Sequence, residues 1–263
     1  MKNKGIKLAK KAFQLRPKRF SIAWMLPNFL TICALIFGLQ AMYQALFSNW
    51  DSVIIMIIIA SVFDMLDGRV ARMLKSTSEF GMHLDSLSDF VVFGAVPAFA
   101  VYLWMDKPQE NIFWIVIVLY VICSALRLAR FNSELSERPS YAKNYFNGVP
   151  TPAAAFLMLF PLAIEGYLDE YMLKSFDVVG FWIVFISISM VSNLPTFSGK
   201  VFQIPKSFVI PMLIILALLS NAIISNPIKG FIILVLVYII SIPFASLFYM
   251  RLKKKAEALN IKT

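Results

Sequence analysis

Apolar runs long enough to cross a lipid bilayer dominate this sequence. A transmembrane helix needs roughly 17–25 predominantly apolar residues, because the hydrocarbon core of a bilayer is about 30 Å thick. Runs of this kind recur along the 263-residue chain, of which 59% is hydrophobic and only 15% charged, with a mean hydropathy of +0.74. Soluble domains carry far more charge than this. We therefore expect an all-α polytopic membrane protein.

These apolar runs predict about eight transmembrane helices. The first run follows a basic segment, but its length of about 22 residues and its lack of a small-residue cleavage site favour a retained helix over a signal peptide. The fifth run is the shortest, and its prolines make its ends difficult to predict. The expected helices span residues 26–47, 53–73, 81–105, 111–131, 150–166, 178–194, 208–225 and 230–250.

The expected helices form one transmembrane catalytic domain, residues 26–250. A basic segment, residues 1–25, precedes it and a basic tail, residues 251–263, follows it. The first segment is expected to lie in the cytoplasm, either as an amphipathic helix on the inner leaflet or as a plain tail that orients the chain. The second is expected to be cytoplasmic as well.

Lysines and arginines gather on one side of this expected topology. If both termini are cytoplasmic, 22 of the 25 cationic residues fall on the cytoplasmic side. Only Lys107, Lys174 and Lys229 fall on the other side. Cytoplasmic loops of membrane proteins carry such an excess. The net charge of +10 is therefore attributed to topology and to contact with anionic lipid, and not to nucleic-acid binding.

Four aspartates interrupt the apolar pattern in the second and third expected helices. Asp64 and Asp67 are three residues apart, and Asp85 and Asp89 are four apart, so each pair shares one face of its helix. The two helices are consecutive and are expected to form an antiparallel hairpin that turns near LKSTSE, residues 74–79. The pairs would then face each other at the same depth. Each charge inside a membrane costs roughly 2.5–3.5 kcal/mol unless something offsets it.

Divalent cations between the two pairs would offset this cost. Ligands that are all oxygen favour Mg²⁺ or Mn²⁺, and two such ions can clamp the attacking and leaving oxygens of a phosphoryl transfer. Gly68 and Gly81 lie between the pairs and would allow a helix or ligand to approach closely. Arg72 is placed to contact a phosphate. A solvated helix flank is the alternative, but it does not explain two facing acidic stripes.

The spacing of these residues resembles the signature of the CDP-alcohol phosphatidyltransferase family, DxxDGxxARx8GxxxDxxxD. Every defined position is matched, by Asp64, Asp67, Gly68, Ala71, Arg72, Gly81, Asp85 and Asp89. The resemblance implies a bundle typical of that family, with a homodimeric assembly. It also implies an enzyme that displaces CMP from a CDP-linked lipid, using a hydroxyl nucleophile and two divalent cations, Mg²⁺ or Mn²⁺.

The resemblance assigns expected roles to individual residues. The four aspartates would bind the metal ions, and Asp89 would also be the general base, although sequence alone does not separate a base from a ligand. Arg72 would contact the diphosphate. Asn28 would either contact the nucleotide or cap a helix. The expected nucleotide and diphosphate site comprises Asn28, Gly68, Ala71, Arg72, Ser78 and Gly81.

Three further stretches resemble the bacterial and archaeal phosphatidylserine synthase branch of the family. They are LPNFLT at 26–31, LRLARFN at 126–132 and FNGVPTPAAA at 146–155. The branch implies CDP-diacylglycerol and L-serine as substrates, at a cytoplasmic site in a bacterial membrane. Arg127 and Arg130 would address the serine carboxylate, and Asn132 its ammonium group. Both arginines also fit a simple role as cytoplasmic anchors.

Other acceptors and one other class of protein stay open. Glycerol 3-phosphate or inositol phosphate would need more cations around the acceptor, whereas choline would need an aromatic cage. A cation transporter would spread carboxylates through the membrane depth or break its helices near the midplane. In this sequence the acids of the spans cluster on one side, which favours the enzyme.

Overall fold

The computed structural model describes residues 22–105, 111–133, 145–165, 174–197 and 225–258. Most of the expected N-terminal segment and almost all of the span expected at 208–225 lie outside these residues. The helices are α2 (Ile22–Leu46), α3 (Trp50–Met73), α4 (Glu79–Asp89), the π-helix η1 (Phe90–Ala95), α5 (Val96–Trp104), α6 (Asn111–Ser133), α7 (Thr151–Ile164), α9 (Phe176–Val191) and α11 (Pro227–Ala258).

Four of the described helical segments are long and apolar enough to cross a membrane. They are Met25–Leu46, Glu79–Trp104, Asn111–Ser133 and Pro227–Arg251. The helices α7 and α9 are apolar but shorter. A helical integral membrane protein is thus confirmed, while the count of about eight spans stays a prediction. The helix α11 continues without a break beyond this apolar segment into the basic tail, as far as Ala258.

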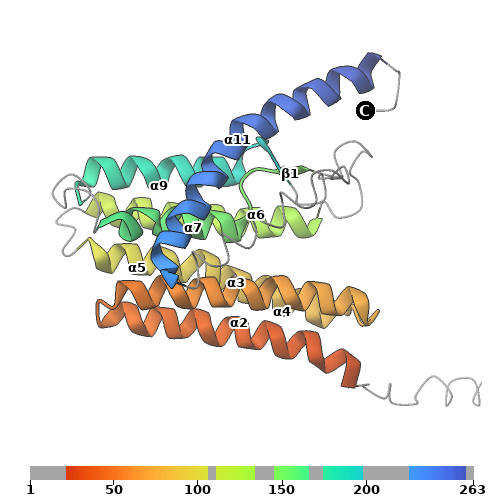
Figure 1. Ribbon diagram of the computed structural model, residues 1–263, viewed down its shortest axis with the longest axis horizontal. Helices are drawn as coiled ribbons and strands as arrows, with labels where there is room; N and C mark the ends of the chain where they lie inside the picture. Colours follow the sequence, from red (N-terminus) through yellow and green to blue (C-terminus); the bar gives the residue numbers. More distant parts are fainter. Residues whose placement is uncertain (1–21, 106–110, 134–144, 166–173, 198–224, 259–263) are drawn as a thin grey trace, which may run out of the picture.

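The helices form a layered bundle (Figure 1). In this view α2 and α3 lie side by side at one edge, α9 lies at the opposite edge, and α6 and α7 lie between them. The long helix α11 crosses the others obliquely and contacts both α7 and α3. The core between these layers contains large buried side chains such as Trp104, Phe93 and Phe113.

The helix α2 packs through a stripe of small residues. Ala34, Gly38, Ala41 and Ala45 are buried at helical spacing, which allows neighbouring backbones to approach. A β-carbon on Gly38 would lie only 2.7 Å from a methyl group of Val92 in η1. The close approach brings α2 against both the α3 helix and the π-helical segment.

The expected hairpin between the two acidic helices is confirmed. The helix α3 ends at Met73, and α4 begins at Glu79 after a short turn. The Ser78 hydroxyl caps α4 by accepting a hydrogen bond from the Gly81 amide at 3.0 Å. The helix expected at 81–105 was only partly correct, because residues 90–95 form a π-helix between two α-helices.

A short two-stranded sheet joins two connections that are distant in sequence. Strand β1 (Tyr145–Asn147) pairs antiparallel with β2 (Pro195–Phe197), with Phe146 opposite Thr196. Gly148 follows β1 with φ of +76° and packs against the carbonyl oxygens that end α9, so no side chain fits there. The all-α prediction did not foresee this pair, which fixes the start of α7 beside the end of α9.

Candidate active site

Three of the four predicted aspartates converge where α3 faces α4. Asp64, Asp67 and Asp85 each present one carboxylate oxygen, and these oxygens all lie within 4.8 Å of one another. Asp89 lies one turn beyond Asp85, and its side chain is within hydrogen-bonding range of Asp64. Such a set of hard oxygen ligands fits a divalent cation of the Mg²⁺ or Mn²⁺ type.

A hydroxyl group from α2 holds one of these carboxylates. Thr31 donates a hydrogen bond to Oδ2 of Asp67 across 2.5 Å, and its oxygen also lies 3.2 Å from the carbonyl of Pro27. Both side chains are buried, with Asp67 only 5% exposed. Thr31 was not predicted as a site residue, although it is the last residue of the LPNFLT stretch at 26–31. This hydrogen bond orients a candidate metal ligand.

Asn28 and Gly81 form a close pair between α2 and α4. A β-carbon on Gly81 would lie 2.9 Å from Oδ1 of Asn28, so the glycine leaves room for this amide. The Asn28 side chain is buried, and its Nδ2 group has no hydrogen-bond partner among the described residues. Asn28 therefore offers a free donor near the aspartates. Ser78, in contrast, already uses its oxygen as the cap of α4.

Gly68 and Arg72 share the surface near the end of α3. A β-carbon on Gly68 would lie 3.4 Å from Nη1 of Arg72, so the guanidinium group extends back over the glycine. Arg72 is exposed, and its charge acts on Asp67. Ala71 is half-buried beside it on the same helix. A permanent cation at this place can contact a phosphate group.

The three predicted acceptor residues contact three different elements. Arg127 is 9% exposed and donates from Nη1 to the Thr151 hydroxyl at 2.9 Å, which joins α6 to the start of α7. Arg130 donates to Oδ1 of Asn193 at 2.6 Å. These two contacts reach neighbouring helix ends, because the β1–β2 pair holds the start of α7 beside the end of α9.

Further contacts tie Arg130 and Asn132 to neighbouring helices. Arg130 also donates from Nη1 to the carbonyl of Val191 at 3.3 Å, and a cation at the C-terminal end of a helix such as α9 is favourable. Asn132 donates from Nδ2 to the Ser86 hydroxyl at 2.9 Å, which ties the end of α6 to α4. Of the three, Arg127 is the buried one, and the acceptor role of all three residues stays a prediction.

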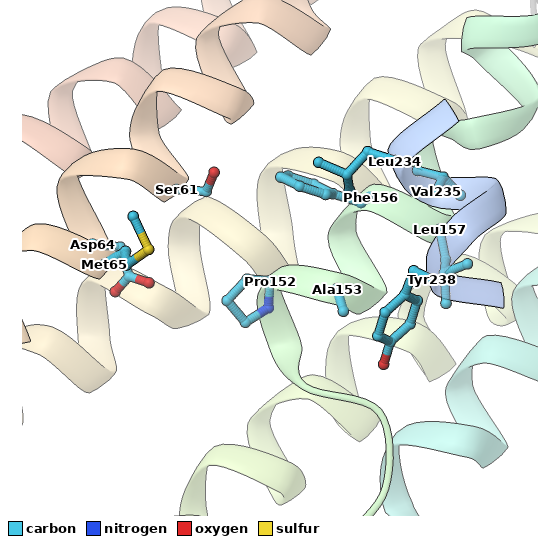
Figure 2. A pocket seen from close by; sticks show the side chains of 10 residues that line it. All are labelled: Ser61, Asp64, Met65, Pro152, Ala153, Phe156, Leu157, Leu234, Val235 and Tyr238. Atoms are coloured by element: carbon cyan, nitrogen blue, oxygen red, sulfur yellow. The ribbon is translucent and has the colours of Figure 1, made fainter. Parts of the chain in front are cut away.

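A cavity of about 330 Å³ lies beside the aspartates, between α3, α7 and α11. Figure 2 shows Ser61 and Asp64 at one end and Tyr238 at the other, with Pro152 and Ala153 between them. The remaining lining residues are Met65, Phe156, Leu157, Leu234 and Val235. This cavity could not be predicted from the sequence, because the apolar residues of α11 form no motif.

Comparison with known proteins agrees with this geometry. A sequence model of the CDP-alcohol phosphatidyltransferase family matches residues 24–191, which include all four aspartates. A Mycobacterium bovis protein named CDP-diacylglycerol–serine O-phosphatidyltransferase is 34% identical over 223 residues, 84% of this chain and 78% of the relative.

More distant organisms have relatives with the same name. A Helicobacter pylori protein is 33% identical over 174 residues, 65% of this chain and 71% of the relative. A Methanocaldococcus jannaschii protein is 33% identical over 178 residues, 66% of this chain and 76% of the relative. With its signature residues gathered at one site and the family model matched over most of its length, the chain belongs to the CDP-alcohol phosphatidyltransferase family.

Proposed function

We propose that this protein is a phosphatidylserine synthase, which transfers the phosphatidyl group of CDP-diacylglycerol to the hydroxyl of L-serine and releases CMP. The observation that carries the proposal is the convergence of Asp64, Asp67 and Asp85, with Asp89 next to Asp64. The choice of serine rests on the names of the relatives, which all specify this acceptor.

The aspartates hold the catalytic cations in this proposal. Two Mg²⁺ or Mn²⁺ ions bound by Asp64, Asp67, Asp85 and Asp89 supply charge neutralisation for the diphosphate and the leaving CMP. Thr31 keeps Asp67 in its ligand orientation through the hydrogen bond to Oδ2. Arg72 contacts the diphosphate, and the free Nδ2 of Asn28 donates to the nucleotide.

Asp89 is the proposed general base. The serine hydroxyl is a weak nucleophile until a carboxylate takes its proton. Asp89 accepts that proton while the serine oxygen forms a bond to the phosphorus of the phosphatidyl group. The bond between this phosphorus and the oxygen of CMP breaks, and CMP leaves with the electron pair. Arg127, buried at the end of α6, is the candidate partner for the serine carboxylate.

The cavity beside Asp64 takes one acyl chain of the lipid substrate. It begins at the carboxylate cluster and continues between apolar side chains of α7 and α11 (Figure 2). Each methylene group that leaves water for such a surface contributes about 0.8 kcal/mol. The cavity therefore holds the chain while the phosphate end remains at the aspartates.

The surrounding topology is part of the proposal. In this proposal the cationic ends of α3 and α6, near Arg72 and Arg127, lie in the cytoplasm. Both chain termini lie on the same side. The membrane is a bacterial cytoplasmic membrane, and the enzyme works as a homodimer. Nucleic acid is not a partner.

The test is release of CMP by purified protein in detergent. CDP-diacylglycerol and Mn²⁺ or Mg²⁺ are supplied with serine, choline, glycerol 3-phosphate or inositol phosphate in separate reactions. Release that needs serine and a divalent cation, and that is lost in Asp89→Asn, supports the proposal. CMP release only with another acceptor would support phosphatidyl transfer but refute serine as the acceptor. No CMP release with any acceptor would contradict the enzyme proposal and favour the cation transporter.

A further inference from the structure

The π-helix η1 follows directly after the proposed base. Asp89 is the last residue of α4 and the residue that precedes the π turn. The Val96 amide donates to the carbonyl of Val91, five residues back instead of four. Such π turns are rare and often occur at functional sites.

Pro97 explains why a regular α-helix is unfavourable here. In an α-helix the amide of residue 97 would donate to the carbonyl of Phe93, but proline has no N–H, and its ring collides with that carbonyl. Proline is tolerated in the first turn of a helix, and Pro97 occupies that place in α5. The helix therefore restarts at α5, and the Phe93 carbonyl lacks the donor that residue 97 would supply in a regular α-helix.

Tyr120 of α6 supplies that donor. Its hydroxyl donates to the Phe93 carbonyl across 2.9 Å, and the side chain is completely buried. One turn further along α6, Ser124 packs against Gly94, where a β-carbon would lie 2.7 Å from the serine oxygen. The helix α6 thus holds the π turn at two adjacent points. A buried carbonyl that loses its partner costs roughly 1–3 kcal/mol, so the Tyr120 bond favours this turn.

The π turn determines which way α4 faces. A π turn contains one residue more than an α turn, and each residue of an α-helix corresponds to about 100° of rotation. Conversion of the π turn to an α turn would therefore rotate α4 relative to α5 by about 100°. The helix α5 is fixed in the core by buried residues that include Val96, Val101 and Trp104. The helix α4 has only Ser88 buried among its residues. The rotation would therefore move α4, which carries Asp85 and Asp89.

We propose that Tyr120 is a positioning residue of the transfer reaction: by bonding the Phe93 carbonyl that Pro97 leaves without a donor, it stabilises the π turn that directs Asp85 and Asp89 toward Asp64 and Asp67. The kinetic part of this inference rests on the proposed function, whereas the effect on cation binding does not. Tyr120 itself lies on α6 and acts only through the backbone of η1.

The variant Tyr120→Phe removes the hydroxyl group and keeps the ring. The first readout is the affinity of the substrate-free, purified protein for Mn²⁺, measured by electron paramagnetic resonance of the free ion. We expect roughly a 10-fold weaker affinity, the order found when a group supporting a metal ligand is lost. The value of kcat should fall by a similar factor, with the KM for serine unchanged. Tyr43→Phe, at an exposed tyrosine of α2, is the matched control and should change none of these values.

A double-mutant cycle with Pro97→Ala tests the stated cause. The alanine restores an N–H group at position 97, which can satisfy the Phe93 carbonyl in a regular α-helix and so remove the need for Tyr120. Pro97→Ala alone should weaken Mn²⁺ binding, and adding Tyr120→Phe should then have little further effect. Additive effects would overturn the proposal.

Three further results would decide whether Tyr120 positions the aspartates. Unchanged Mn²⁺ affinity in folded Tyr120→Phe, or lower thermal stability alone with normal affinity and kcat, would overturn the proposal. If Tyr120→Phe does not fold, Pro97→Ala alone decides, and unchanged Mn²⁺ affinity in it refutes the role of the turn. Wild-type protein that binds Mn²⁺ but shows no serine-dependent release of CMP refutes the proposed function and leaves the Tyr120 inference standing.

Discussion

Replacing Thr31 by valine should weaken the metal site while leaving the fold intact. Valine has nearly the shape of threonine but has no hydroxyl group, so the change removes the 2.5 Å hydrogen bond to Oδ2 of Asp67. The site is buried, and water does not readily replace the lost donor. The carboxylate then loses the contact that fixes its orientation toward Asp64 and Asp85.

The magnitude follows from the charge of the acceptor. A hydrogen bond to an ionised group contributes about 1.5–3 kcal/mol, which corresponds to roughly a 10- to 150-fold change in an equilibrium constant. The Thr31 hydroxyl also lies 3.2 Å from the carbonyl oxygen of Pro27, but this longer contact to the helix backbone hardly reduces the expected loss of metal affinity. We therefore expect the Mn²⁺ concentration that gives half-maximal CMP release to rise at least 10-fold.

The assay is CMP release at saturating CDP-diacylglycerol and serine across a titration of Mn²⁺. Thr31→Ser keeps the hydroxyl group and serves as the control, with half-maximal Mn²⁺ within a few-fold of wild type. Equal Mn²⁺ dependence for Thr31→Val and wild type would refute the reasoning that the hydrogen bond supports the metal ligand. A fall in protein yield with unchanged Mn²⁺ dependence would refute it as well.

Three further predictions concern the base, the cavity and the opposite end of the bundle. Asp89→Asn should lower kcat by roughly 10²–10⁴-fold, because the serine hydroxyl loses its proton acceptor, and an unchanged kcat would exclude Asp89 as the base. Leu234→Trp should raise the KM for long-chain CDP-diacylglycerol roughly 10-fold, because the larger side chain fills the cavity. Leu236→Trp is the control, since Leu236 is also exposed on α11 but does not line the cavity. Equal effects of the two variants would argue against an acyl chain in the cavity. Glu165→Ala removes the acceptor of the buried Trp104 indole at 2.8 Å and of Lys174 at 2.7 Å, so thermal denaturation should show a Tm several degrees lower with normal CMP release.

The acidic hairpin could be predicted from the sequence because its information is local. The spacing of Asp64 and Asp67, and of Asp85 and Asp89, places each pair on one helix face whatever the rest of the chain does. The short LKSTSE turn then allows little choice of register. The structure accordingly brings Asp64, Asp67 and Asp85 together, as expected from residue spacing.

Contacts between distant segments could not be predicted in this way. The π-helix depends on Pro97 and also on a hydroxyl from α6, and only folding brings Tyr120 to the Phe93 carbonyl. Arg130 contacts the end of α9, which lies within its reach only after the chain has folded. The pairing of β1 with β2 joins segments about fifty residues apart and has no local signal either.

The same limit applies to the lipid cavity. Leu234 and Val235 line it only because α11 crosses α7 beside α3, and α11 lies outside residues 24–191 that match the family. An apolar residue in a membrane helix can face lipid, another helix or a cavity, and the sequence does not distinguish these environments. Only the crossing of α11 in the folded bundle does so (Figure 1).

The most direct measurement follows the serine oxygen through the reaction. L-Serine labelled with ¹⁸O in its hydroxyl group is incubated with CDP-diacylglycerol, Mn²⁺ and the purified protein, and both products are analysed by mass spectrometry. Attack of the serine hydroxyl on phosphorus predicts phosphatidylserine that carries one ¹⁸O atom and CMP that carries none. Label in CMP, unlabelled phosphatidylserine, or CMP formed without phosphatidylserine would contradict transfer to serine at the aspartate site.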